Sequence, residues 1–111
     1  MQDNNNIKNQ LSTKYSVIFF QANWCAPCIV VKPFFKKISN EYEKYADFEI
    51  CNVDDKDSYA IFHKIKSIPT VLILKNKKEI KRINDTKDIV KNLTHFLNDL
   101  FEITENNISA K

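Results

Sequence analysis

The sequence predicts one α/β domain with a mixed sheet of four strands, or of five, and with helices on both faces of the sheet. Three observations lead to this prediction. The chain has 111 residues, the usual length of one domain, and its hydrophobic content of 43% can bury a core. Apolar runs typical of buried strands alternate with helical segments, which places helices between strands. Only a short polar turn separates the last two strand-like runs, which predicts an antiparallel hairpin.

A buried strand and a long helix open the domain. YSVIFFQ, residues 15–21, is a continuous apolar run, and such runs are typical of strands covered on both faces. A helix is expected over about 27–43, because Pro27 lacks an amide hydrogen and is tolerated in a first helical turn. Pro33 lies inside this segment and should kink it. The buried face of the helix is expected to consist of Val30, Phe34, Ile38 and Tyr42.

The middle of the chain predicts three more strands and a short helix. A second buried strand is expected at FEICNVD, residues 48–54, and a third at TVLILK, residues 70–75. A fourth strand is expected at EIKRI, residues 79–83, after the turn NKK at 76–78. Strands that are joined through helices are expected to be parallel neighbours. Asp57 is expected to cap a short helix. The apolar residues of this helix are Ala60, Ile61 and Ile65.

A last helix is expected to begin at Asp85 or Thr86. Its buried side is predicted to contain Ile89, Val90, Leu93, Phe96, Leu97 and Leu100. The composition then divides the chain into a polar arm at 1–12, the domain at 13–101 and a polar tail at 102–111.

Composition narrows the classes of function. The net charge is only +3, and the lysines are scattered, so a nucleic-acid partner is not expected. No apolar run reaches the roughly 18 residues of a membrane span, and the start has no apolar stretch of a secretory signal. We therefore expect a cytoplasmic monomer with no membrane partner, or an organellar one if a targeting segment was removed. Glycine is absent, so Asn and Asp are expected wherever φ is positive.

The stretch WCAPC carries the chemistry. Cys25 falls where the first strand meets the first helix, and the unpaired amides and the dipole of a helix N-terminus favour a thiolate there. A thiolate is the form that attacks a disulfide. Cys28 lies one helical turn further on, within reach of the same sulfur, and Pro27 stiffens the segment between them. The pair is thus expected to exchange disulfides.

Other readings of the cysteines and histidines are weaker. The two cysteines could be small buried hydrophobes, or they could hold zinc with Cys51 and His63. Cys51 lies within a predicted buried strand and no second closely spaced ligand pair follows, so no metal is expected and Cys51 should be inert. His63 is expected at the surface and His95 in the last helix, structural or exposed. The run at 75–82 reads as a solvated hairpin, with steering of acidic clients as the alternative.

Two motifs at a matched separation resemble the thioredoxin family over most of the chain. WCAPC is similar to its Trp-Cys-x-Pro-Cys signature, and SIPT at 67–70 is similar to its Ile-Pro-Thr segment. Pro33 falls where that family kinks its active-site helix. The resemblance implies the thioredoxin fold.

The resemblance also implies roles for individual residues. Cys25 would be the nucleophile and Cys28 the resolving thiol. The Ile68–Pro69 bond would be cis and would face the cysteines, presenting the backbone to a client strand and keeping metals away. The residues expected to bind the substrate are Trp24, Ala26, Pro27, Ile68 and Pro69.

The implied activity is thiol–disulfide oxidoreduction that reduces protein disulfides. By the same resemblance, electrons would come from a flavoprotein, an NADPH-dependent thioredoxin reductase. No bound cofactor is expected beyond the redox-active disulfide itself. Two alternatives stay open. One is a disulfide isomerase or oxidase, and the other is a thioredoxin-like module that binds extended peptides and has a narrowed range of clients.

The chain departs from the family pattern in three ways. Phe19 stands where most members bury an aspartate, and Ile50 stands where the lysine facing it usually lies. The family's first strand has no room before residue 15. The glycine expected near the client groove is replaced by Asn84, Asp85 or Thr86.

Overall fold

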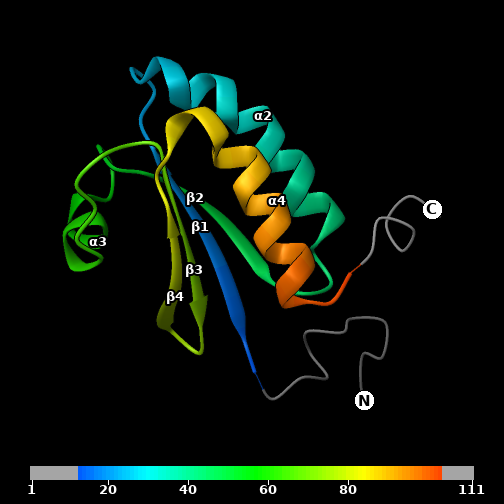
Figure 1. The fold of residues 1–111 in the computed structure, drawn as a ribbon. Coiled ribbons are helices and arrows are strands. Elements are labelled where there is room, and N and C mark those ends of the chain that lie inside the picture. The colour runs from blue at the N-terminus through cyan, green and yellow to red at the C-terminus, as the bar shows by residue number, and fades with distance from the viewer. Residues whose placement is uncertain (1–12, 104–111) are drawn as a thin grey trace.

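The computed structural model describes residues 13–103, and within them the predicted order of elements is confirmed (Figure 1). Four strands form one mixed sheet in the order β2-β1-β3-β4. Strand β1 (Tyr15–Gln21) is parallel to β2 (Asp47–Asn52), as expected. Strand β3 (Thr70–Lys75) is antiparallel to both neighbours, β1 and β4 (Lys78–Ile83), so the parallel prediction was wrong for β3. The arm at 1–12 and all but the first two residues of the tail lie outside the described residues.

Helices cover both faces of the sheet, as predicted. Helix α2 (Ala26–Glu41) and helix α4 (Ile89–Leu100) lie together on one face, and the short helix α3 (Asp57–Phe62) lies on the other (Figure 1). A 3-10 turn, η1 (Thr86–Asp88), leads into α4 with Asp85 as its cap. Two apolar clusters result, a large one under α2 and α4 and a small one under α3. Parallel strands, such as the pair β1 and β2, usually have both faces of their sheet covered in this way.

The buried face of α2 differs from the prediction. Val30 and Phe34 are 64% and 52% exposed. Residues four apart on a helix of 3.6 residues per turn drift steadily around it, so a strict spacing of four cannot stay on one face. The buried residues alternate spacings of three and four instead: Cys28, Val31, Phe35, Ile38 and, just after the helix, Tyr42. The helix runs on through Pro33.

Two local expectations around β2 also fail. The strand was predicted to be buried, yet only Cys51 in it is fully buried, because β1 is its one neighbour among the described residues. It ends at Asn52, whose side-chain oxygen accepts a hydrogen bond from the backbone of Asp54 at 2.9 Å and turns the chain. Asp57 lies in the first turn of α3, and Lys56 takes the cap position without a side-chain bond.

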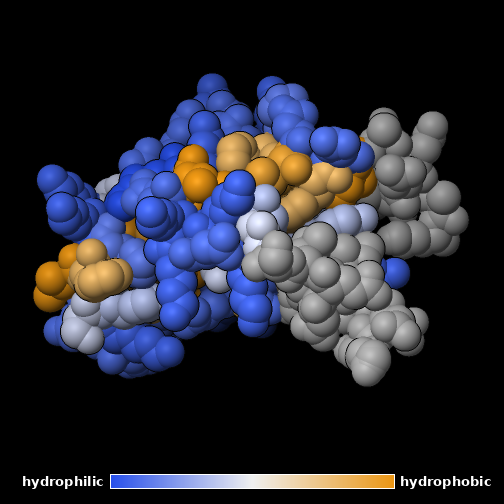
Figure 2. Space-filling view, turned by 90° about the horizontal axis from the view of Figure 1, so that it is seen from below, coloured by the Kyte–Doolittle hydropathy of each residue, from blue (hydrophilic) through white to orange (hydrophobic). Residues whose placement is uncertain are grey.

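The expectation that Asn or Asp takes the positions with positive φ holds at one of four such positions among the described residues, and Lys or Glu takes the other three. Positive φ angles occur at Asn76 and Lys77 in the β3–β4 turn, at Lys64 after α3, and at Glu102. The end of the molecule that carries the β3–β4 turn is largely hydrophilic (Figure 2), which confirms a solvated hairpin. Among the described residues, no helix is long and apolar enough to cross a bilayer.

Candidate functional site

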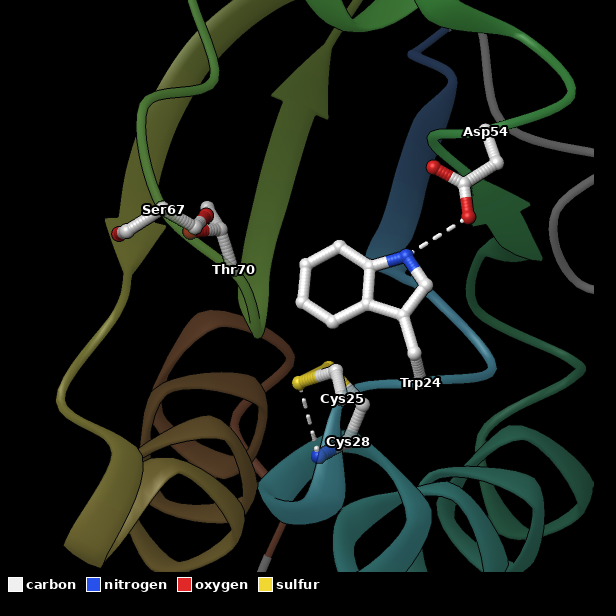
Figure 3. The surroundings of a disulfide bond; sticks show 6 residues. All are labelled: Trp24, Cys25, Cys28, Asp54, Ser67 and Thr70. Carbon is white, nitrogen blue, oxygen red and sulfur yellow. Dashed lines mark hydrogen bonds between the residues drawn. A yellow bond between two sulfur atoms is a disulfide. The ribbon is translucent and has the colours of Figure 1, made fainter.

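A disulfide between Cys25 and Cys28 lies at the junction of β1 and α2 (Figure 3). The two Cα atoms are 5.2 Å apart, within the normal range for a disulfide. Cys25 has an extended backbone and serves as the N-cap of α2. Its Sγ accepts a hydrogen bond from the backbone N–H of Cys28 at 3.3 Å. The sulfur of Cys25 is therefore the side-chain cap of the helix and accepts one of the amide hydrogens that the first turn leaves without a partner.

The two cysteines belong to the same apolar cluster but differ in access to solvent. Cys25 keeps 5% of its surface exposed, whereas Cys28 is completely buried. Phe19, also completely buried, belongs to this cluster, and its ring centre lies 5.2 Å from that of Phe35. Phe19 is the direct neighbour of Ile50 across β1 and β2, so the apolar pair expected there is present. The buried polar side chains of the described residues are those of Gln21 and Thr70, so no carboxylate is buried beside Cys28.

Trp24 stands over the disulfide and is held by an acidic residue that the sequence reasoning did not single out. The indole is 70% exposed, and its Nε1–H donates to Oδ2 of Asp54 at 2.8 Å (Figure 3). A signal for this contact was present in the topology. Trp24 follows β1 and Asp54 follows β2, and parallel neighbouring strands end at the same edge of a sheet. Ala26 and Pro27, the other predicted binding residues of this turn, are exposed beside it.

The Ile68–Pro69 peptide bond is cis, as the resemblance implied. Thr70 fixes this turn by donating its hydroxyl to the carbonyl of Ser67 at 2.6 Å. Ile68 packs against the cluster that contains both cysteines. Within the described residues, neither the N–H nor the C=O of Ile68 forms a hydrogen bond. A backbone that borders a disulfide and has both polar groups free can pair with an added strand.

The other candidate ligands do not join the site. Cys51 is buried under α3, and burial raises the pKa of its thiol, with the charge of Glu49 adding to the shift. His63 ends α3 among the rings of Tyr59 and Phe62, half-buried rather than at the surface. Burial, followed by the charge of Arg82, lowers the pKa of His63. No cluster of three or more metal-binding side chains exists in residues 13–103.

Arg82 holds the loop that leads from α3 to the cis-proline turn, a role that the sequence reasoning missed. Its guanidinium donates to the carbonyls of His63 at 2.7 Å and of Lys64 at 3.2 Å. It also forms two hydrogen bonds with the carboxylate of Glu79 at 2.9 Å, and these bonds lower the pKa of Glu79. His95 lies on the exposed side of α4 and pairs with Asp99 at 3.3 Å, away from these contacts.

Comparisons with known proteins agree with this geometry. The family model described as Thioredoxin matches residues 2–99. Thioredoxin-1 of Saccharomyces cerevisiae is 36% identical over 70 residues, 63% of this chain and 67% of its own length. The H-type thioredoxin of Fagopyrum esculentum is 36% identical over 72 residues, 65% of this chain and 61% of its own length. The solved structure of oxidised mitochondrial thioredoxin 3 of Saccharomyces cerevisiae superposes with a TM-score of 0.70 at 26% identity, covering 83% of this chain and 85% of that one.

Proposed function

The chain belongs to the thioredoxin family of protein-disulfide oxidoreductases, and from this premise we propose that it reduces disulfides of protein clients through Cys25 and Cys28. One observation carries the proposal. The two cysteines are already joined as a disulfide at a helix N-terminus, and Cys25 keeps a small exposed surface whereas Cys28 is completely buried. The described state is then the oxidised product of a turnover.

The proposed reaction has two exchange steps. In the reduced protein, the thiolate of Cys25 attacks one sulfur of the client disulfide, a Cys25–client bond forms, and the second client sulfur leaves as a thiolate that takes a proton from solvent. The thiol of Cys28 then loses its proton and attacks Sγ of Cys25. The Cys25–Cys28 disulfide forms and the first client sulfur leaves. That sulfur leaves as a thiolate and takes a proton from solvent, as the second client sulfur did. Two electrons have passed from the protein to the client, and the protons are exchanged through the solvent.

The unequal environments of the sulfurs support this division of roles. Cys25 caps the helix, and its sulfur accepts the N–H of Cys28, an interaction that becomes stronger when the sulfur carries a charge. Cys28 has no surface from which to meet a client, but it lies in contact with the sulfur of Cys25. A buried thiol that can reach only its neighbour is suited to resolving a mixed disulfide.

The client would dock as an extended strand across the exposed residues around the disulfide. Trp24, Ala26 and Pro27 offer one side of this surface, and the Ile68–Pro69 turn offers the other. The free backbone groups of Ile68 favour this mode, because main-chain pairing binds an extended segment without demanding one sequence. An oxidase or isomerase would use the same residues with a different redox poise.

The oxidised pair must be reduced again for the next turnover. Members of the thioredoxin family generally receive electrons from thioredoxin reductase, and we take the NADPH-dependent flavoprotein form as the partner of this chain. A cytoplasmic monomer is the form in which we expect it to act, since a reducing compartment keeps catalytic thiols available.

Trapping of clients tests the proposed roles. The Cys28→Ser variant should still attack through Cys25 but should accumulate covalent adducts with a disulfide-containing protein, seen on a non-reducing gel. The Cys25→Ser variant is the matched control and should trap none. Adducts on Cys25→Ser alone would reverse the roles. If the wild type binds the client but neither it nor the variants exchange disulfides with it, the chain is a binding module.

A further inference from the structure

A basic hollow lies beside the cis-proline turn and is not used by the disulfide chemistry. It has a volume of about 350 Å³, and its lining is Lys64, Lys66, Ser67, Thr70, Arg82 and Asn84. Three of these six residues are cations and none is an acid. Ser67 is the residue directly before Ile68, so the wall of the hollow and the proposed docking backbone belong to one continuous turn.

The net charge of the hollow comes from its two lysines. Arg82 is largely neutralised, because Glu79 accepts two hydrogen bonds from its guanidinium. Lys64 and Lys66 are exposed, and neither forms an ion pair with another described residue. Two cations that are left without partners around a concave surface raise the local concentration of anions.

The loop that carries the lysines is held in place before any ligand arrives. The carbonyls of His63 and Lys64 accept hydrogen bonds from Arg82, and the backbone N–H groups of Lys64 and Ile65 donate to the last turn of α3 at 2.9 Å each. On the other side, Thr70 holds Ser67. The backbone therefore fixes where both ammonium groups can reach, which lowers the entropy lost on binding.

We propose that this hollow, defined by Lys64, Lys66 and Arg82, binds a carboxylate side chain of the client close to the half-cystine that the client presents to Cys25. The inference rests on the proposed function. Consecutive Cα atoms lie about 3.8 Å apart, so a client strand paired with Ile68 brings a residue within one or two positions of its cysteine to the hollow. Proteins with Asp or Glu at that position would be the preferred substrates.

The test uses three disulfide peptides that differ only in having Asp, Asn or Lys beside the cystine. Trp24 is the single tryptophan and adjoins Cys25, so its fluorescence reports oxidation of the pre-reduced protein in stopped flow. At low ionic strength the Asp peptide should react about three- to tenfold faster than the Asn peptide, and the Lys peptide more slowly still. This preference should shrink as salt screens the charges.

Charge variants locate the effect. Changing Lys64→Gln and Lys66→Gln together should bring the Asp-to-Asn ratio close to one. The matched control changes Lys75→Gln and Lys78→Gln, which removes the same charge from the exposed hairpin at the other end of β3, about 17 Å of strand away, and should keep the ratio. The pair Lys64→Glu and Lys66→Glu should invert the order so that the Lys peptide leads.

The outcomes separate the two proposals. If the Asn peptide is not reduced at all, the proposed function is wrong. If all peptides react equally in the wild type, the function stands and the hollow has no part in choosing clients. A preference that survives Lys64→Gln with Lys66→Gln, or that disappears in the hairpin control, also overturns the inference, because the charge that matters then lies elsewhere.

Discussion

Replacing Phe19 tests what the site loses by having no carboxylate near Cys28. Truncating a fully buried Phe costs about 3–5 kcal/mol, and an unpaired buried polar group costs about 1–3 kcal/mol more. Phe19→Asp should therefore lower the free energy of unfolding by about 4–8 kcal/mol, out of the roughly 5–15 kcal/mol of a typical domain. Ile50→Lys should recover part of this loss, because residue 50 is the neighbour of residue 19 and is half-exposed, so a lysine there can reach water.

The kinetic effect should run in the opposite direction. In the wild type, the proton of Cys28 has no buried carboxylate to accept it, so it must leave to water or hydroxide. The rate at which a mixed disulfide resolves should then rise about tenfold for each pH unit from about pH 6 to about pH 8, following the thiolate fraction. With Phe19→Asp and Ile50→Lys together, a carboxylate can act as general base. Resolution near neutral pH should be faster and its dependence on pH shallower.

The assay is the release of thionitrobenzoate from a mixed disulfide with Cys25, followed by absorbance across that pH range. The matched control is Phe19→Asn with Ile50→Lys, which leaves a similar cavity but no base. Circular dichroism establishes whether each variant folds. The reasoning is refuted by a wild-type rate that is flat with pH, or by an Asn variant as fast as the Asp variant. If neither double variant folds, the wild-type pH profile still decides.

Three further predictions concern the contact between Trp24 and Asp54, the loop held by Arg82, and Cys51 under α3. Asp54→Ala should free the Trp24 indole and lower its fluorescence anisotropy. Client reduction should slow about fivefold, because the loss of one hydrogen bond costs about 1 kcal/mol. An unchanged anisotropy would argue against this contact. Arg82→Gln should cost about 1–3 kcal/mol in urea denaturation and should raise the pKa of His63 measured by NMR. Because the folded pKa of His63 is depressed, the wild type loses stability as pH falls through the unfolded value of 6.5 towards the folded one, and the variant should lose less. Cys51 should resist alkylation in the folded reduced protein and react on denaturation; labelling of Cys51 as fast as Cys25 would contradict its burial.

The fold and the reactive pair could be predicted because their signals are local. The continuous apolar run at 15–21 is typical of a strand covered on both faces, and the WCAPC motif placed a cysteine at a helix start. The predicted buried face of α2 was wrong because Val30 and Phe34 are apolar but exposed. Hydrophobicity alone does not distinguish an exposed apolar residue from a buried one. Where a helix carries more apolar residues than one face can bury, only the packing of the neighbouring helix decides.

The contacts that complete the site were not predicted, because they join residues distant in the sequence and depend on how the strands pair. Asp54 reaches Trp24 only once β1 and β2 are paired, and Arg82 reaches the carbonyl of His63 only once β4 lies beside the end of α3. The sequence shows an acid after one strand and a single arginine in another, without showing which partners they meet. A long polar side chain can form hydrogen bonds with several different groups, and only the tertiary structure determines which of these groups lies within its reach.

The two margins of the docking surface carry opposite charge, so a charged client strand should bind in one chain direction in preference to the other. Asp54 lies at the Trp24 side, whereas Lys64 and Lys66 lie beyond Ser67 on the cis-proline side. If a client strand pairs with Ile68 and places its acid in the basic hollow, its other end passes Trp24 near a carboxylate. Reversing that strand would bring acid to acid and leave the lysines unpaired, which costs free energy on both sides. Peptides with Asp before the cystine and Lys after it should thus react at a different rate from peptides with the same residues exchanged, although their net charge is equal. Equal rates for the two orders would mean that charge attracts the client without orienting it.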